Sequence, residues 1–453
     1  MCASRRTKPD AKRNNVLIIK SQEELCMKEL WKLFLGIMQE EMVPAMGCTE
    51  PIALAFASAR AREILGGYPQ RIVAKCSGNM IKNVRCVTIP ASGGKTGIET
   101  ACALGAFAGD ASRNMEVLGA VTEENREKAA AFVDAGLCTV EYLESDIPLH
   151  FVIEEMLGED TVSVEIRYDH TNIFRTEKNG MILYQGTDER FGNESADRSA
   201  LSVENIKEFA DQVDLNLVKP LIEREIRFNM DIAYEGMSGD YGLGIGRIIR
   251  ETYPESVITR MRAYAAAASE ARMDGCEMPV VINSGSGNQG IASSVPVIVY
   301  ARENAIPQEK LYRALVFSSL MTIYQKEFIG KLSAFCGAVS ASCAAGAAIT
   351  YICGGTVQQI KNTIDNTLAD IPGIICDGAK TSCAAKIASA LDAAMLAHSL
   401  AMKGKAYDAY TGILKEDAEE TISCVGYIGR EGMRQTDREI IHVMLEEKKE
   451  WKN

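Results

Sequence analysis

Four cysteines in the C-terminal part of the chain form two pairs with the same internal spacing. Cys336 and Cys343 stand in the segment FCGAVSASCAAGAA, and Cys376 and Cys383 stand in ICDGAKTSCAAKIA, forty residues further on. Thiolates gathered in threes or fours hold iron–sulfur clusters and zinc ions. A single cysteine in an alanine-rich helix is more often a small buried apolar residue. The repeated arrangement favours metal ligation over simple packing.

The first pair belongs to one predicted helix. The uncharged segment 332–360 has a helical pattern with a break near Gly354 and Gly355. Residues seven apart on a continuous helix lie ~10 Å apart along its axis, because each residue adds ~1.5 Å. That separation is too large for one small cluster, so only one of Cys336 and Cys343 is expected to be a ligand.

The second pair flanks a turn. An Asp-Gly turn signal follows Cys376, and Thr381 or Ser382 is placed to cap the apolar helix that begins near Cys383. The N-terminus of that helix would favour an anionic centre. The economical arrangement is a three-ligand site that adds Cys336 to this pair. Three ligands on a four-iron cluster leave one iron open to substrate.

The composition indicates a globular protein of a reducing compartment. The 453 residues are 47% hydrophobic and 24% charged, which is enough for two or three domains. A net charge of −12 argues against nucleic acid or an anionic membrane as partner. Fourteen cysteines, without the pattern of a secretory signal, favour free thiols in the cytoplasm over a disulfide scaffold. Small residues dominate segment 332–360, so a packed central helix is expected there rather than a membrane span.

The order of elements predicts an α+β protein. Residues 1–20 are expected to be a disordered tail, and residues 21–135 and 195–453 to form a large, mainly helical catalytic domain. Between them, residues 136–194 show strand alternation, with a hairpin turn at 178–180, and predict a small α/β module. Two further short strands are expected in the segments RIVAKCSG and VRCVTIP.

A glycine-rich segment is a second candidate site element. Gly285 to Gly290 fits the pattern G-x-G-x-x-G, but no βαβ pattern surrounds it and Pro296 falls inside the expected helix. These features disfavour a dinucleotide site. We expect instead a loop whose backbone N–H groups, together with Asn283, Ser284 and Asn288, meet a substrate carboxylate.

Cys48, in the segment GCTEP, directly precedes a predicted helix. A thiol at a helix N-terminus has a lowered pKa and is a credible base or nucleophile, whereas the alternative is a merely buried thiol. His170, in the segment DHTNI, is either a ligand-facing or a structural residue. His398 lies in a predicted helix and is expected to be structural, and none of the four histidines has zinc-hydrolase spacing.

Seven segments together resemble one known family, and they cover nearly the whole chain. They read GCTEPIALA, SGNMIKNV, DHTNI, NSGSGNQGI, LSAFCGAVSA, AAITYICGG and GIICDGAKTSCAAKIA. The chain resembles the L-cysteine desulfidase family, which is related to the alpha part of iron–sulfur L-serine dehydratases. The resemblance implies a [4Fe-4S] cluster held by Cys336, Cys376 and Cys383, and it implies Cys48 as the residue that transfers a proton.

The resemblance also implies where substrate binds. The expected substrate-binding residues are polar members of the same segments: Thr49, Asn79, His170, Asn172, Asn283, Ser284 and Gly285. Serine dehydratases carry a terminal cysteine that can cap the fourth iron, and a Ser-His-Thr-rich motif. This sequence ends EEKKEWKN and has neither feature, which favours cysteine over serine as substrate.

The expected function is that of a lyase: iron–sulfur-dependent β-elimination on L-cysteine, giving hydrogen sulfide, ammonia and pyruvate. An L-serine dehydratase is the nearest alternative, although hydroxide is the poorer leaving group. A non-catalytic iron–sulfur redox sensor is an alternative from another class, but an electron carrier normally has four protein ligands. A pyridoxal-phosphate lyase would need a Schiff-base lysine such as Lys331, Lys380 or Lys386. We expect a small amino acid as ligand and allow for a homodimer.

Overall fold

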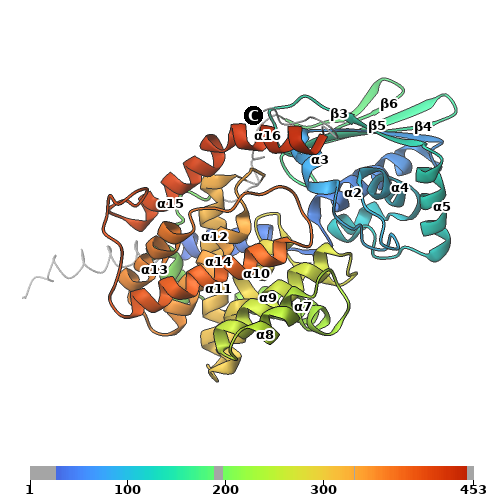
Figure 1. Ribbon diagram of the computed structural model, residues 1–453. Coiled ribbons are helices and arrows are strands. Elements are labelled where there is room, and N and C mark those ends of the chain that lie inside the picture. The colour runs from blue at the N-terminus through green and yellow to red at the C-terminus, as the bar shows by residue number, and fades with distance from the viewer. Residues whose placement is uncertain (1–26, 188–196, 331, 446–453) are drawn as a thin grey trace, which may run out of the picture.

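The computed structural model describes residues 27–187, 197–330 and 332–445, and the predicted tail of residues 1–20 lies outside them. Helices dominate these residues, and a six-stranded sheet holds most of the strands. Figure 1 shows the sheet and its helices on one side of the molecule and a larger helical part on the other. The predicted α+β class, with a large helical part and a smaller β-containing part, is confirmed.

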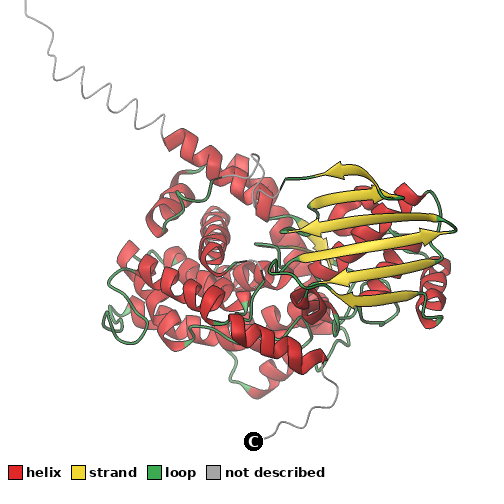
Figure 2. Ribbon diagram, turned by 90° about the horizontal axis from the view of Figure 1, so that it is seen from above, coloured by secondary structure: helices red, strands yellow, loops and turns green. Residues whose placement is uncertain are grey.

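The six strands of the sheet come from two separated stretches of the chain. They are β2 (Arg71–Cys76), β3 (Cys138–Tyr142), β4 (His150–Leu157), β5 (Asp160–Arg167), β6 (Ile173–Lys178) and β7 (Met181–Gln185). They lie side by side in one sheet (Figure 2), in the order β3-β2-β4-β5-β6-β7. β2 and β3 run parallel, and the other neighbouring pairs are antiparallel. Because β2 lies in this sheet, the β-containing part begins earlier along the chain than the predicted module of residues 136–194.

Helices cover one face of the sheet. The helical segments of this part are α2 (Thr49–Leu65), α3 (Gly78–Val84), α4 (Ile98–Ala108), the 3₁₀ helix η1 (Ala111–Glu116) and α5 (Glu123–Asp134). α2 packs on β4, β5 and α4, and its small residues allow a close approach. A Cβ on Gly105 would lie only 2.2 Å from the carbonyl oxygen of Ala55, so glycine is required where α4 crosses α2.

Two local strand predictions have different outcomes. The hairpin between β6 and β7 is confirmed, since Asn179 and Gly180 have φ values of +53° and +79°, as a two-residue primed turn requires. The strand expected in VRCVTIP is wrong. The end of α3 runs into that segment, and Thr88 forms only an isolated bridge with Thr96.

The helical part contains a helix over 27–41 and most of the chain after residue 197. Its other elements are β1 (Pro44–Met46), α6 (Val203–Gln212), α7 (Leu215–Ser238), α8 (Ile245–Thr252), α9 (Val257–Met273), β8 (Pro279–Val281), α10 (Gly287–Glu303), α11 (Gln308–Ile329), α12 (Gly337–Ile352), α13 (Val357–Asp370), α14 (Cys383–Met402), α15 (Ala418–Tyr427), the π-helical turn η2 (Ile428–Gly432) and α16 (Arg434–Leu445).

The small-residue helix α12 lies at the centre of the helical part. It packs against α10, α11, α13 and α14, and nearly all of its residues are buried. The predicted break is confirmed, because α12 ends at Ile352 and Gly354 has a φ of +81°. Across the described ranges of the chain, no helix is long and apolar enough to cross a membrane.

Several contacts join the sheet part to the helical part, and two of them involve whole elements. The short strand β1, which leads into α2, pairs antiparallel with β8. The last described helix, α16, reaches across to α3 (Figure 1). There the buried ammonium group of Lys82 forms an ion pair with Asp437.

Candidate active site

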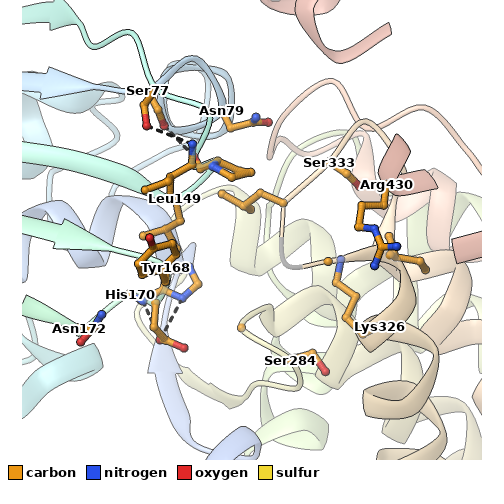
Figure 3. A pocket seen from close by; sticks show the side chains of 18 of the residues that line it. Ser77, Asn79, Leu149, Tyr168, His170, Asn172, Ser284, Lys326, Ser333 and Arg430 are labelled. Atoms are coloured by element: carbon orange, nitrogen blue, oxygen red, sulfur yellow. Dashed lines mark hydrogen bonds and ion pairs between the residues drawn. The ribbon is translucent and has the colours of Figure 1, made fainter. Parts of the chain in front are cut away.

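A large cleft lies between the sheet part and the helical part and encloses about 2120 Å³. Figure 3 shows Asn79 and His170 on the sheet side of the cleft and Ser284 and Lys326 on the helical side. Asn79 is half-buried, and its Oδ1 accepts no hydrogen bond from the described part of the chain. A concave site between two parts of a chain, lined by polar groups of both, is the usual place for a small-molecule ligand.

In the helical part, two chain segments bring three cysteines together. Cys336 is the N-cap residue of α12, and Cys383 is the first residue of α14. The backbone N–H of Cys336 donates to the carbonyl of Ile374 at 2.9 Å, and that of Cys376 donates to Ala334 at 2.7 Å. These two bonds fix the segment before α12 against the segment before α14.

The three thiols are close enough to influence one another. The pKa of Cys336 is raised to about 12. Burial is the main cause, and the neighbouring thiols of Cys376 and Cys383 contribute to the same shift. Cys343 has no part in this group. It is fully buried inside α12, with Thr367 beside its thiol. The structure therefore separates the members of the first sequence pair and brings together the members of the second.

The donor set suits a cluster better than a single ion. In the residues that the structure describes, no three His, Cys, Asp or Glu side chains are grouped to hold one metal ion. An iron–sulfur cluster makes a different demand, because each cysteine binds a different iron and the sulfurs need not converge on one point. Three neighbouring thiols, two of them at helix N-termini, meet that demand.

The loop that carries Cys376 is held by an acidic residue with two lysines. Asp377 forms ion pairs with Lys380 and Lys386. Burial opposes ionisation of Asp377, but the hydrogen bonds from the two lysines outweigh it and lower its pKa to about 2. Both amines are thus engaged as structural cations, which disfavours them as Schiff-base lysines. Lys331 lies outside the described residues.

The cap expected for α14 is not formed. Ser382 occupies the N-cap position, but its side chain makes no capping hydrogen bond and its backbone is already helical. The expected cap is therefore wrong, and the backbone N–H groups of the first turn of α14, where Cys383 is the first residue, have no side-chain cap.

Cys48 and Glu50 form a buried pair at the start of α2. The thiol of Cys48 donates to Oε2 of Glu50 at 3.0 Å, and the amide of Asn83 donates to Oε1 at 3.0 Å. The hydroxyl of Thr49 lies within hydrogen-bond distance of Glu50 Oε2, at 3.0 Å, and of the carbonyl of Gly285, at 2.9 Å. The pair is thereby linked to the turn that forms the helical wall of the cleft.

The charge in this pair resides on the carboxylate. Burial and the adjacent Glu50 raise the pKa of Cys48 well above its usual value, and Arg272 only partly offsets them. The predicted lowering of the Cys48 pKa by the helix N-terminus is therefore wrong, because desolvation of the thiolate dominates. Burial also opposes ionisation of Glu50, but the charge of His170 and the hydrogen bond from Cys48 lower its pKa overall.

Arg272, near the C-terminus of α9, is a site residue that the sequence reasoning missed. It is almost completely buried, and it interacts electrostatically with Cys48, Glu50 and Cys383. The candidate base and one candidate cluster ligand therefore both act on the same guanidinium group. A signal existed in the sequence, since Arg272 is a charged residue in an alanine-rich helix whose neighbours are buried.

The predicted substrate-binding residues fall into three groups. Asn79, His170, Ser284 and Gly285 line the cleft, and Thr49 lies directly behind Gly285. Asn283 also lies in the 283–286 turn, but it is fully buried and its amide donates to the carbonyl of Ser319.

Asn172 stands at the exposed rim, where its amide donates to the carbonyl of Arg167 and holds the β5–β6 loop. The dinucleotide interpretation of the glycine-rich segment stays disfavoured, because a short β8 and a tight turn precede α10 rather than a βαβ unit.

Comparison with known families agrees with this geometry. Residues 112–442 match the serine dehydratase alpha chain family. The chain belongs to this family. The match covers most of the cleft lining, the turn before α10 and all three cysteines of the thiol group, so the family-level resemblance predicted from the seven segments is confirmed.

Curated relatives cover almost the whole chain. A UPF0597 protein of Lachnoclostridium phytofermentans is 46% identical over 92% of this chain and 100% of its own length. A UPF0597 protein of Treponema denticola is 44% identical over 91% and 98%, respectively. One from Desulfitobacterium hafniense is 45% identical over 92% and 97%. Family membership supports the chemistry of a lyase that acts on a small molecule.

Proposed function

We propose that the protein catalyses iron–sulfur-dependent β-elimination on L-cysteine, with hydrogen sulfide, ammonia and pyruvate as products. Elimination releases the sulfur and leaves aminoacrylate, which water converts to pyruvate and ammonia. The observation that carries the proposal is buried Arg272, which interacts electrostatically with both members of the thiol–carboxylate pair and with Cys383. A proton acceptor and one candidate cluster ligand are thus within electrostatic reach of the same guanidinium group.

Cys336, Cys376 and Cys383 would hold a [4Fe-4S] cluster, which when bound supplies an open iron that acts as a Lewis acid toward the leaving group. The free thiols that this requires persist in a reducing cytoplasm. The Asp377 ion pairs keep the ligand loop in place. The cleft, with His170 and Ser284 at its walls, would admit and orient the amino acid.

Cys48 and Glu50 would move the α-proton. At neutral pH the proton of the pair lies on sulfur and the charge on the carboxylate, so Cys48 can act as a base only if Glu50 accepts the thiol proton. The 3.0 Å contact between Sγ and Oε2 permits that transfer. The thiolate then takes the proton from the substrate α-carbon. General bases contribute about 10²- to 10⁴-fold to a rate.

An L-serine dehydratase is the second candidate, favoured by the description of the matched family. Loss of hydroxide from L-serine needs more acid assistance than loss of sulfide from L-cysteine. In the described residues around the thiol group, the charged partners of Asp377 are lysines already held in ion pairs. These two lysines are therefore engaged and poorly placed to serve as the acid for a hydroxyl leaving group, and we prefer cysteine.

The test is an anaerobic preparation assayed for iron, acid-labile sulfide and turnover. We expect about four irons per chain, a broad visible absorption that fades in air, and sulfide release from L-cysteine that exceeds pyruvate formation from L-serine. A faster reaction with L-serine would select the dehydratase. A protein that contains iron and eliminates from neither amino acid would favour the redox sensor, and a sharp oxygen-stable band would indicate pyridoxal phosphate.

A further inference from the structure

One edge of the Arg272 guanidinium group lies near the thiol of Cys48 but has no oxygen or nitrogen acceptor among the described residues. Nη1 donates to Oδ1 of Asn288 at 3.1 Å, but Nε and Nη2 make no hydrogen bond with any of the described residues. The side chain is 98% buried, since its relative exposure is 2%. Buried guanidinium donors are costly to leave unpaired, so this edge is built for an acceptor that arrives from elsewhere.

The two unpaired atoms have a specific geometry. Nε–H and one Nη2–H of a guanidinium group point in the same direction and together match the two oxygens of a carboxylate. The resident carboxylate nearby does not meet this demand, because the oxygens of Glu50 already accept from Cys48 and Asn83. The edge therefore suits a carboxylate that the protein itself does not supply.

The location of Arg272 matches the ends of an amino-acid substrate. It interacts with Cys48, the candidate base for the α-proton, and with Cys383, a candidate ligand of the cluster that would bind the leaving group. In an α-amino acid, the α-carbon carries the carboxylate and lies one carbon away from the β-leaving group. A substrate that spans these two sites would place its carboxylate beside the guanidinium group.

The turn before α10 connects Arg272 to the cleft. Ser284 and Gly285 line the cleft, and two residues later Gly287 lies against Arg272. A Cβ on Gly287 would be 2.3 Å from Nε and 2.6 Å from Cζ of Arg272. The absence of a side chain at position 287 therefore leaves room for the guanidinium group behind the wall of the cleft.

We propose that Arg272 is the carboxylate-binding residue of the site and that it restricts the ligands to α-amino acids or similar small carboxylates. We call this contact between Arg272 and the ligand carboxylate the clamp. The identity of the reaction rests on the proposed function, whereas the clamp does not. A bidentate charged contact of this kind contributes about 1.5–3 kcal/mol, equivalent to about tenfold to hundredfold in binding.

The test is isothermal titration of the anaerobically purified protein with L-alanine and with ethylamine. L-Alanine has the α-carboxylate but no leaving group, and ethylamine is the same molecule without the carboxylate. Wild-type protein should bind L-alanine at least about tenfold more tightly than ethylamine. Arg272→Gln should lose that preference with unchanged iron content and visible spectrum, and Arg272→Lys should keep part of it.

Two further variants separate a specific role from a structural one. Gly287→Ala retains the charge but displaces the guanidinium group, so it should also lose the preference for L-alanine. Arg262→Gln, on the same helix and paired with Asp392, removes an equal charge outside the site and should bind both ligands as wild type does. Equal weakening of both ligands in Arg272→Gln, or unchanged binding of L-alanine, would overturn the clamp.

Failure of the clamp and failure of the proposed function give different results. If wild type binds L-alanine through Arg272 but releases no sulfide from L-cysteine, the clamp stands and the elimination is refuted. If wild type releases sulfide and Arg272→Gln keeps the wild-type KM for L-cysteine, the elimination stands and the clamp is refuted. No measurable preference of wild type for L-alanine over ethylamine also refutes the clamp.

Discussion

Cys336 and Cys343 are both buried cysteines of the same helical segment, yet their surroundings differ. The sulfur of Cys336 lies beside Cys376 and Cys383, whereas that of Cys343 lies beside Thr367 in the interior of α12. We predict that replacement of Cys336, Cys376 or Cys383 by alanine removes the iron, and that Cys343→Ala retains it. Measurement of the iron content per chain in anaerobic preparations of the four alanine variants tests this prediction. Iron loss in Cys343→Ala with retention in Cys336→Ala would mean that the wrong cysteine has been chosen.

The second prediction at the residue scale concerns the Cys48–Glu50 pair. Cys48→Ala removes the proposed base, so turnover should fall by about 10²-fold or more while the cluster spectrum is unchanged. Glu50→Gln should also lower turnover, because the thiol then has no acceptor for its proton. Cys76→Ala changes an equally buried thiol on β2 and is the matched control. Near-normal turnover of Cys48→Ala would show that Cys48 is not the base, and it would leave the proposed cluster unaffected.

The pH dependence follows from the same pair. The pKa of Glu50 is lowered, so the carboxylate stays charged until the pH falls below the usual range of glutamate, about 4.3. Loss of the proton acceptor should therefore contribute no fall in rate between about pH 5 and pH 7. A rate profile of kcat that drops with an apparent pKa near 6 would show that a group other than Glu50 accepts the proton.

At the scale of elements, a buried carboxyl group joins α2, α4 and β4. Ser58 on α2 lies 2.8 Å from the carbonyl of Cys102 and 2.5 Å from Oε1 of Glu155. A hydroxyl has one hydrogen, so when Ser58 donates to the carbonyl, Glu155 must donate to Ser58 and be protonated. Burial raises the pKa of Glu155 to about 8, which agrees with a neutral carboxyl group between helix and sheet.

This buried acid makes stability depend on pH. The folded pKa of Glu155 is above the unfolded value of about 4.3, so its contribution is fully present below that value and is lost as the pH rises through about 8. Glu155→Gln should gain stability relative to wild type by at most about 1.4 kcal/mol per pH unit over this window. Urea unfolding at pH 5, 7 and 8.5 measures the difference. A constant difference at all three values would show that Glu155 is already ionised in the folded protein.

The sequence predicts local elements better than it predicts their partners. The thiol group was predictable because spacing and a turn signal report local geometry, and the β6–β7 hairpin was predictable because Asn-Gly specifies its own turn. The parallel pairing of β2 with β3 was not, since it joins segments separated by α3, α4 and α5. The roles of Glu50 and Arg272 depend on contacts between α2, α9 and the turn before α10. The hydrophobic periodicity of a sequence does not report contacts between such distant segments.

At the scale of the whole molecule, α16 connects the end of the described chain to the thiol group. The side chain of Lys82 on α3 is 1% exposed and pairs with Asp437 on α16, whose side chain is 13% exposed. The carbonyl of Lys82 in turn lies so close to Gly378 that a Cβ there would be 2.2 Å from the oxygen. The ion pair therefore holds α16 on α3, and α3 lies directly against the loop of Cys376.

We predict that Asp437→Asn destabilises the protein by about 3–5 kcal/mol, because it leaves the charge of Lys82 buried without its counter-charge. The double variant Lys82→Met/Asp437→Leu removes both charges and should recover most of the loss, since a well-packed apolar pair can replace a buried ion pair. Urea unfolding of wild type, Lys82→Met, Asp437→Leu and the double variant gives the coupling energy. Because the loop of Cys376 rests on α3, Asp437→Asn should also release iron faster to a chelator than the double variant does. A single variant as stable as wild type would show that Lys82 is solvated in solution and that α16 does not hold the two parts of the molecule together.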